Sequence, residues 1–423
     1  MTFRFLHAAD LHLDTPFSGI SVTAPEVASE LRDASLTTFD HLVRLAISRD
    51  VAFVVIAGDL YDGAARGVRA QLELLRGLGE LSDRGIRTFI AAGNHDPVDE
   101  GWSAVREWPE LVTIFPSDGP QSVVVERNGQ PIATVHGISY ARREVTDDLA
   151  ASIRPTDDPG PHIAVLHANV GEVPDHAPYS PAALDDLVES GIDYWALGHI
   201  HQQTVLHRDP WVVYSGSTQA RSAAPFERGP KGVLIVEVAD DGTIAEPEFV
   251  AIDRVRFDRI DHSVEGVPDL ATLRDRLVDV GRRCLAEADG RSVLLQVELV
   301  GRGAVHRELY RPGALVELID GLRSESLSDA PLLWWDRIDV STRPVQDLDE
   351  LQGRNDFIAD LIDETAALLA DDDARARRTE DWDDELPSDL YHLLDGLAPS
   401  AAAPARWTSA QELAVDLVAG DDA

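Results

Sequence analysis

The first hundred residues alternate between short apolar runs and longer segments with apolar side chains at helical spacing. The runs Phe3–Ala9, Val51–Ala57 and Ile86–Ala92 have the length and composition of buried strands. Between them, residues 26–49 and 68–81 repeat apolar side chains every three or four positions, which predicts helices. This strand–helix order predicts parallel strands with helices packed outside the sheet.

After Pro120 the pattern changes to shorter strands joined by turns. Asn128-Gly129 and Asp241-Gly242 are typical hairpin turns. From about Phe257 longer elements return. The expected strands are 122–126, 132–138, 163–167, 194–197, 212–214, 232–238 and 244–250, followed by a helix at 270–288, a strand at 292–300, a helix at 313–322 and a strand at 332–340.

Polar side chains follow five of the expected strands at the point where each strand ends. They are Asp10 and His12, Asp59, Asn94-His95-Asp96, His167, and His199 with His201. In an extended segment residues i and i+2 point the same way, so each D-x-H or H-x-H pair can face one cavity. Oxygen and imidazole donors together suit manganese, iron or zinc better than calcium. The sequence therefore predicts a two-metal site at these strand ends.

The ordered pattern D-x-H, GD, GNHD, H and GHxH resembles the calcineurin-like metallophosphoesterases. The opening FLHAADLHLD and the segment GDLYD are similar to the DNA-repair nuclease branch of SbcD and YhaO. The resemblance covers roughly residues 1–340. It implies an α/β fold: a two-sheet β-sandwich flanked by helices, with a small α/β capping domain. We expect a nuclease domain at 1–252, the capping domain at 253–342 and an acidic helical tail at 343–423.

The resemblance also implies a role for each polar residue. Asp59 is the candidate to bridge two cations, because one carboxylate can serve both metals of a two-metal hydrolase. Asp10, His12 and His201 complete the protein ligands of one metal, and Asn94, His167 and His199 those of the other. We expect Mn²⁺ at both positions, with Fe²⁺ and Zn²⁺ as alternatives.

His95 is expected to face the substrate rather than a metal. Its imidazole titrates near neutral pH and can give a proton to a departing alkoxide, and we expect Asp96 to orient it. The alternative is that His95 is a further metal ligand. Asp62 stands where some relatives carry a histidine, which leaves open whether a second proton-handling group exists.

Composition limits the cellular setting and the mode of DNA binding. Cys284 is the only cysteine, so the chain cannot form an internal disulfide, and we expect a reducing cytoplasm. No apolar run approaches the length of a membrane span. The formal net charge of −38 opposes DNA binding by this chain alone. Solubility or host adaptation is the other interpretation of this charge.

Three functions remain open on the sequence. The favoured one is a metal-dependent DNA exonuclease or endonuclease, working with a partner that holds DNA. The second is a phosphatase or phosphodiesterase for nucleotides or other small phosphoesters. The third is a catalytically weak scaffold subunit. The complete ligand set argues against a scaffold, and the extra domains argue against a small-molecule phosphatase.

The tail carries three apolar stripes at helical spacing. They comprise Leu351, Phe357, Ile358, Leu361, Ile362, Leu368 and Leu369, then Leu390 to Leu397, then a helix expected to start at Ser409. Such stripes must be buried against something. The resemblance implies docking to a coiled-coil ATPase of the SbcC or YhaN type. The alternatives are packing on this chain's own core and pairing of two subunits in a homodimer.

Overall fold

The computed structural model describes residues 2–15, 25–62, 67–100, 104–171, 179–326, 331–345 and 348–375 except 355, with isolated positions from 377 to 418. The chain forms two compact units. The first comprises Met1–Ile260, Val278–Val297 and Ile319–Ile338, and the second comprises Asp261–Leu277, Glu298–Leu318 and Asp339–Ala423.

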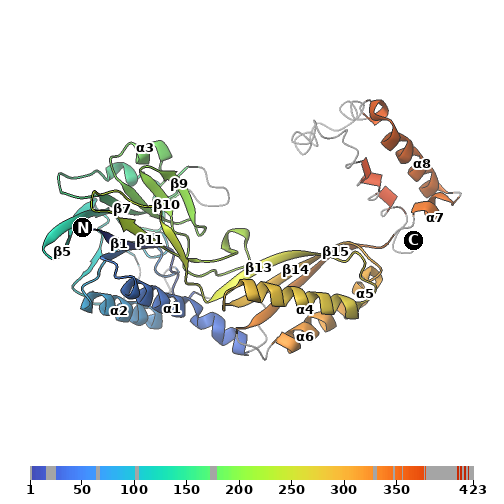
Figure 1. Cartoon of the computed structure of the whole chain (residues 1–423), viewed down its shortest axis with the longest axis horizontal. Coiled ribbons are helices and arrows are strands. Elements are labelled where there is room, and N and C mark those ends of the chain that lie inside the picture. Colours follow the sequence, from blue (N-terminus) through green and yellow to red (C-terminus); the bar gives the residue numbers. More distant parts are fainter. Residues whose placement is uncertain are drawn as a thin grey trace. The chain divides into compact units, whose positions relative to one another are not determined.

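The first unit contains two six-stranded sheets (Figure 1). The first sheet has the order β12-β11-β1-β2-β3-β4, in which β1 to β4 run parallel. Its elements are β1 (Phe3–Ala8), β2 (Phe53–Ala57), β3 (Arg87–Ala91), β4 (Val112–Ile114), β11 (Gly232–Val238) and β12 (Glu248–Ala251). Helices α1 (Pro25–Ser48) and α2 (Val68–Asp83) lie side by side on its outer face.

The second sheet has the order β5-β6-β7-β8-β10-β9. Its elements are β5 (Gln121–Arg127), β6 (Gln130–Gly137), β7 (His162–His167), β8 (Tyr194–Gly198), β9 (Thr204–Arg208) and β10 (Trp211–Tyr214). The short helices η1 (Ala150–Ser152) and α3 (Leu184–Val188) cover its outer face, and η2 (Pro225–Glu227) precedes β11. Asn128 and Gly129 join β5 to β6 with positive φ angles, as the hairpin turn requires.

The two sheets face each other across an apolar core. Phe5, Phe53 and Phe89 of the first sheet and Val165 and Tyr194 of the second belong to this core, and all five are fully buried. Because alternate strand residues point to opposite faces, the other half of each strand packs against the outer helices. The expected α/β sandwich flanked by helices is therefore confirmed.

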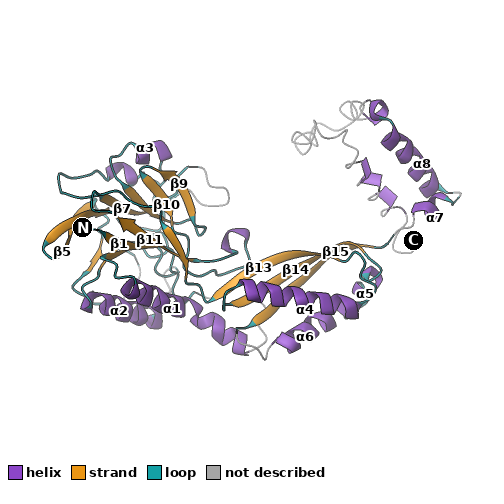
Figure 2. Ribbon diagram, in the orientation of Figure 1, coloured by secondary structure: helices purple, strands orange, loops and turns teal. Residues whose placement is uncertain are grey.

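A third sheet, β13-β14-β15, follows the sandwich, with helices α4 and α6 along it (Figure 2). Its elements are β13 (Val255–Ser263), α4 (Leu270–Glu287), β14 (Ser292–Arg302), α5 (His306–Leu309), α6 (Ala314–Ser326) and β15 (Leu333–Arg343). Sequence reasoning missed β4, β9, α3, β13 and α5. It also placed the last strand of the sandwich at 244–250, whereas β12 covers Glu248–Ala251.

The described part of the tail contains α7 (Leu348–Gln352) and α8 (Phe357–Ala370). Asp356 caps α8, because its carboxylate accepts the N–H groups of Ile358 and Ala359. Leu351, Ile358 and Ile362 form a small buried cluster with Val415. The second expected stripe, Leu390 to Leu397, and the expected start of the third at Ser409 lie outside the described residues.

Candidate metal centre

The polar residues that follow β1, β2, β3, β7 and β8 meet where the two sheets of the sandwich come together. The loops after β1 and β2 are joined by backbone hydrogen bonds, from Asp10 N–H to the Gly58 carbonyl and from His12 N–H to the Asp59 carbonyl. The second sheet joins them through His167, whose Nδ1 lies 2.9 Å from the carbonyl of Ala57. The sandwich therefore fixes all five strand ends against one another.

The backbone at this site is not extended, contrary to our expectation for the D-x-H and H-x-H pairs. Asp10, His12, Asp59 and His199 have φ angles of 50°, 42°, 53° and 98°. These values lie outside the regions that side chains other than glycine commonly adopt. Such strained residues cluster at functional sites, where the surrounding structure holds them. Left-handed turns, and not strand alternation, direct these side chains toward one another.

Two glycines allow the loops to approach this closely. A Cβ on Gly93 would lie 2.3 Å from Asp59 Oδ1 and 2.9 Å from the Asp59 backbone nitrogen. A Cβ on Gly58, whose φ is +88°, would lie 2.4 Å from His167 Nδ1. Both positions need glycine because a side chain would displace a candidate ligand.

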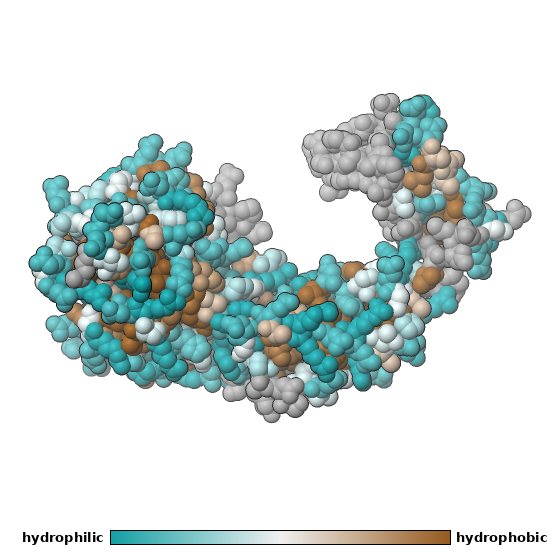
Figure 3. Space-filling model, in the orientation of Figure 1, coloured by the Kyte–Doolittle hydropathy of each residue, from teal (hydrophilic) through white to brown (hydrophobic). Residues whose placement is uncertain are grey.

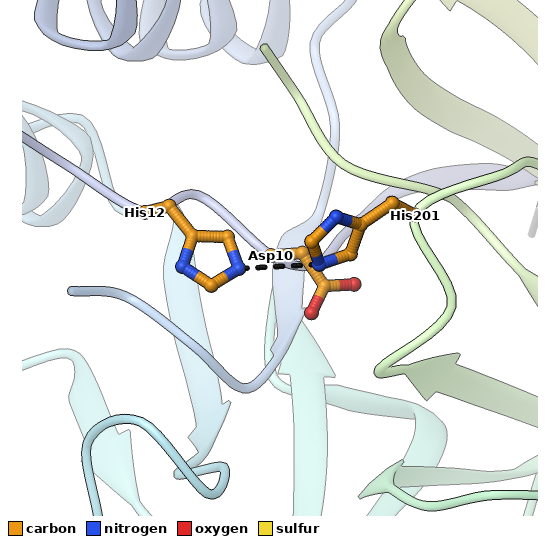
Figure 4. A group of neighbouring side chains, drawn as sticks. All are labelled: Asp10, His12 and His201. Atoms are coloured by element: carbon orange, nitrogen blue, oxygen red, sulfur yellow. Dashed lines mark hydrogen bonds between the residues drawn. The ribbon is translucent and has the colours of Figure 1, made fainter. Parts of the chain in front are cut away.

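The first group of donors is Asp10, His12 and His201, shown in Figure 4. The Nε2 atoms of His12 and His201 lie 3.3 Å apart, with the carboxylate of Asp10 beside them. All three residues are at most 8% exposed. Burial is the largest cause lowering the pKa of both histidines, so both imidazoles are neutral and can offer a lone pair.

The second group is Asp10, Asp59 and His167, with Asn94 beside it. His167 Nε2 lies 3.4 Å from Asp59 Oδ2 and 2.9 Å from Asn94 Oδ1. Asp59 Oδ2 also lies 3.8 Å from His12 Nε2, so this carboxylate lies between the two groups. Burial lowers the pKa of His167 to about 3.

The donor set fits divalent cations. Burial, and then the charge of Asp59, raises the pKa of Asp10 well above its usual value, because two carboxylates are enclosed together. Buried charges are costly unless paired or bound to metal. Cations among these atoms would stabilise both carboxylates and use the imidazole lone pairs.

The remaining expected ligand, His199, lies at the same edge. Its backbone N–H donates to both carboxylate oxygens of Asp10, at 3.1 and 3.2 Å. Its ring centroid lies 5.2 Å from that of His167. The structure therefore places all seven residues expected as ligands at one edge of the sandwich: Asp10, His12, Asp59, Asn94, His167, His199 and His201.

His95 lies at the edge of this site and pairs with a carboxylate that we had not expected. Its Nδ1 lies 2.6 Å from Asp62 Oδ1, and its backbone N–H donates to Asp59 Oδ1. Burial opposes protonation of His95, but Asp62 and then Asp59 outweigh it and raise its pKa. We expected Asp96 to orient His95. Asp96 accepts hydrogen bonds from the backbone of Leu60 and Gly93, at 2.8 Å each, which links the loops after β2 and β3. Its role in orienting His95 stays a prediction.

His95 also belongs to a third group of donors. Together with His12 and Asp62 it could hold a metal ion. The alternative role of His95 as a ligand therefore stays open on geometry alone.

Comparison with known proteins shows the family of this chain. Residues 3–203 match the family "Calcineurin-like phosphoesterase", and residues 257–343 match "Metallophosphoesterase YhaO, middle domain". The chain is 34% identical over 82% of its length to an uncharacterized metallophosphoesterase YhaO of Bacillus subtilis, covering 84% of that protein. The chain belongs to the calcineurin-like phosphoesterase family.

Two archaeal relatives of this phosphoesterase are each named DNA double-strand break repair protein Mre11. The protein from Haloferax volcanii is 29% identical over 76% of this chain and 68% of its own length. That from Halobacterium salinarum is 27% identical over 90% of this chain and 99% of its own length. The resemblance to the SbcD and YhaO branch is therefore confirmed at the level of the family.

Sequence reasoning missed three charged residues of this phosphoesterase site. Arg221 NH1 lies 3.4 Å from Asp62 Oδ2, and its Nε lies 3.7 Å from Glu227 Oε1. Glu227 Oε1 in turn lies 2.9 Å from Nδ1 of His201, and Lys231 donates to the His201 carbonyl. The one available signal was that Lys231 is the only lysine in a chain otherwise supplied with arginine.

Among the described residues, no helix of this phosphoesterase is both long and apolar enough to cross a bilayer.

Proposed function

We propose that this chain is a metal-dependent DNA nuclease that hydrolyses phosphodiester bonds. The observation that carries the proposal is the position of His95. An imidazole of raised pKa, held by Asp62, lies beside two groups of buried metal donors. A proton donor next to a metal site is what cleavage of an ester with an alkoxide leaving group needs.

Asp10, His12 and His201 would hold one metal, and Asn94, His167 and His199 the other, with Asp59 shared. When bound, two such cations supply hydroxide near neutral pH and neutralise charge on the phosphate. We propose Mn²⁺ for both, because mixed oxygen and imidazole donors suit it, with Fe²⁺ or Zn²⁺ as alternatives.

Residues of the chain supply the proton for the leaving group and positive charge for the phosphate. His95 gives its proton to the leaving oxygen, and Asp62 keeps its ring in place and protonated. Arg221, whose side chain is 21% exposed, lies beside Asp62 and offers positive charge to a phosphate at the rim. No serine or cysteine nucleophile is required in this scheme.

DNA is the proposed substrate, held with the help of a partner. Support comes from the relatives named as DNA repair proteins. With a net charge of −38 the chain is repelled by DNA at long range, so a partner must supply most of the basic surface. The proposed setting is the cytoplasm, and the proposed division of the chain remains 1–252, 253–342 and 343–423.

The tail supports docking to a coiled-coil ATPase of the SbcC or YhaN type. Apolar residues show at the surface along α8 (Figure 3), where Phe357 is 65% exposed. An exposed aromatic residue on an amphipathic helix suits helix-in-groove recognition. Pairing of two copies of this chain is the alternative use of the same surface.

A small phosphoester is the alternative substrate, and one assay separates the two. Single-stranded DNA, duplex ends, bis-p-nitrophenyl phosphate and p-nitrophenyl phosphate are offered with Mn²⁺ to the same preparation. We expect cleavage of DNA and of the diester, and little cleavage of the monoester. Monoester hydrolysis far faster than any DNA cleavage contradicts the nuclease assignment, and no hydrolysis at all favours the scaffold.

A further inference from the structure

The segment from η2 to the start of β11 lies directly behind the candidate ligand His201. Glu227 is 1% exposed, and its Oε1 lies 2.9 Å from Nδ1 of His201. Lys231 is 3% exposed, and its Nζ donates to the carbonyls of His201 and Phe226, at 2.7 Å each. Two buried, oppositely charged side chains thus hold the ring and the backbone of one residue.

The contact with Glu227 decides which nitrogen of His201 faces the cavity. A carboxylate only accepts hydrogen bonds, so Nδ1 of His201 must carry the proton. Nε2 is then the atom with the free lone pair, and Nε2 is the atom 3.3 Å from His12 Nε2. A carboxylate behind a ligating histidine fixes the tautomer and the ring orientation in many metal sites.

The contact with Lys231 fixes the backbone that carries the ring. The His201 carbonyl accepts from Lys231 Nζ and, at 3.2 Å, from the backbone N–H of Ser217. A compact ammonium can donate to two converging carbonyls, whereas a planar guanidinium is larger and spreads its donors. Lys231 is the only lysine of the chain, and all its remaining Lys or Arg positions are arginine. The two converging carbonyls explain why this position has a lysine.

We propose that Glu227 and Lys231 are positioning residues for His201, and that they control occupancy of the metal held by Asp10, His12 and His201. They touch neither substrate nor metal and act through the ring and carbonyl of His201. The contacts that Glu227 and Lys231 make to His201 do not involve Asp59 or His167, so we expect the second donor group to keep its ion. The inference rests on the metal centre of the proposed function.

The test is the metal content of the full chain after chelation and titration with Mn²⁺. For the wild type we expect two bound ions and the electron paramagnetic resonance spectrum of a coupled pair. Glu227→Gln, Lys231→Met and Lys231→Arg should each bind one ion about 10- to 100-fold more weakly. At Mn²⁺ concentrations that saturate the tighter site, each variant should show one ion with an uncoupled six-line spectrum. Glu248→Gln, which changes an exposed carboxylate paired with Arg49, is the charge-matched control and should behave as the wild type.

The outcomes separate this inference from the proposed function. If the wild-type chain binds no metal in this titration, the result contradicts the proposed function itself. A wild type with two ions and variants that also keep two, or an arginine variant that behaves as the wild type, overturns the positioning role. Variants that lose both ions show a general structural role, which also overturns it.

A measurement on the unaltered protein covers the case in which the variants do not fold. Labelling with ¹⁵N-lysine gives one side-chain signal, because the chain has one lysine. We expect an ammonium signal protected from exchange that shifts when Zn²⁺ fills the site. A signal that does not respond to Zn²⁺ overturns the coupling between Lys231 and the metal.

Discussion

Nε2 of His12 and Nε2 of His201 lie 3.3 Å apart in the buried interior of the first unit. Glu227 accepts the Nδ1 proton of His201, so the cavity side of that ring carries a lone pair. Asp10 lies beside both rings, and its burial with Asp59 disfavours two free carboxylates. Electron-pair donors converge on one space here, and a divalent cation is the group that satisfies them together.

Asp62→Asn should reduce turnover while both metals remain bound. Asparagine keeps the size of the side chain but removes the charge that raises the pKa of His95. We expect kcat for a diester to fall by roughly 100-fold, the scale of a general acid's contribution. Because the pKa of His95 then falls, the alkaline loss of activity should move to lower pH. Stopped assays across pH with parallel metal analysis measure both effects.

Asp33→Asn is the control for this change, since Asp33 pairs with Arg69 on the surface. It should leave turnover and its pH dependence unchanged. An Asp62 variant with normal turnover, or one that has lost its metals, means that Asp62 does not act through His95.

Gly93→Ala should disturb Asp59 and weaken metal binding. The new methyl group would lie 2.3 Å from Asp59 Oδ1 and 2.9 Å from the Asp59 backbone nitrogen, so a shift of the Asp59 side chain alone would not relieve the clash. Overpacking of this kind costs about 1–3 kcal/mol. Gly79→Ala, in α2 with no atom within 4 Å of the new Cβ, should instead stabilise the fold by about 0.5–1 kcal/mol. Urea denaturation measures the stability of the two variants, and metal titration measures their affinity for metal. If Gly93→Ala and Gly79→Ala have the same stability and the same affinity, the predicted clash with Asp59 is wrong.

The sequence was sufficient for much of the fold because its signals are local. Buried strands such as Phe53–Ala57 are continuous apolar runs, and the Asn128-Gly129 turn needs only its own residues. Strands such as β9, with partly exposed residues, lack that signal. The candidate ligands could be located in the sequence because each follows a strand. The pairing of His95 with Asp62 could not, because it depends on how the left-handed loops turn the side chains.

His136 should make stability depend on pH. Its Nε2 lies 2.8 Å from Nδ1 of His162, and burial followed by that neighbour lowers its pKa to about 4. Above pH 6.5 both folded and unfolded chains are neutral at this residue. As the pH falls from about 6.5 to about 4, the unfolded chain gains the proton first, so the folded state loses stability.

His136→Gln isolates this contribution. In chelated protein, the free energy of unfolding of the wild type should fall more between pH 7.5 and pH 5 than that of the variant, by about 1–3 kcal/mol. An equal fall in the two proteins shows that His136 does not titrate as described.

Phe357→Asp should weaken capture of the coiled-coil ATPase without changing cleavage of a small diester. Phe357 is exposed on α8, and a carboxylate there opposes burial in an apolar groove. Val316→Asp, at a 63% exposed position on α6, is the matched control. Co-purification of each full-length variant with the ATPase gives the comparison. Undiminished capture by the Phe357 variant excludes this face as the docking surface.

The most direct test of the account compares metal content and Mn²⁺-dependent diester hydrolysis in Asp59→Ala and His95→Asn. The account predicts that Asp59→Ala loses metal and activity together, because this carboxylate lies between the two donor groups. It predicts that His95→Asn keeps two metals per chain and loses activity. A His95 variant that loses its metals, or an Asp59 variant that keeps both metals and full hydrolysis, contradicts it.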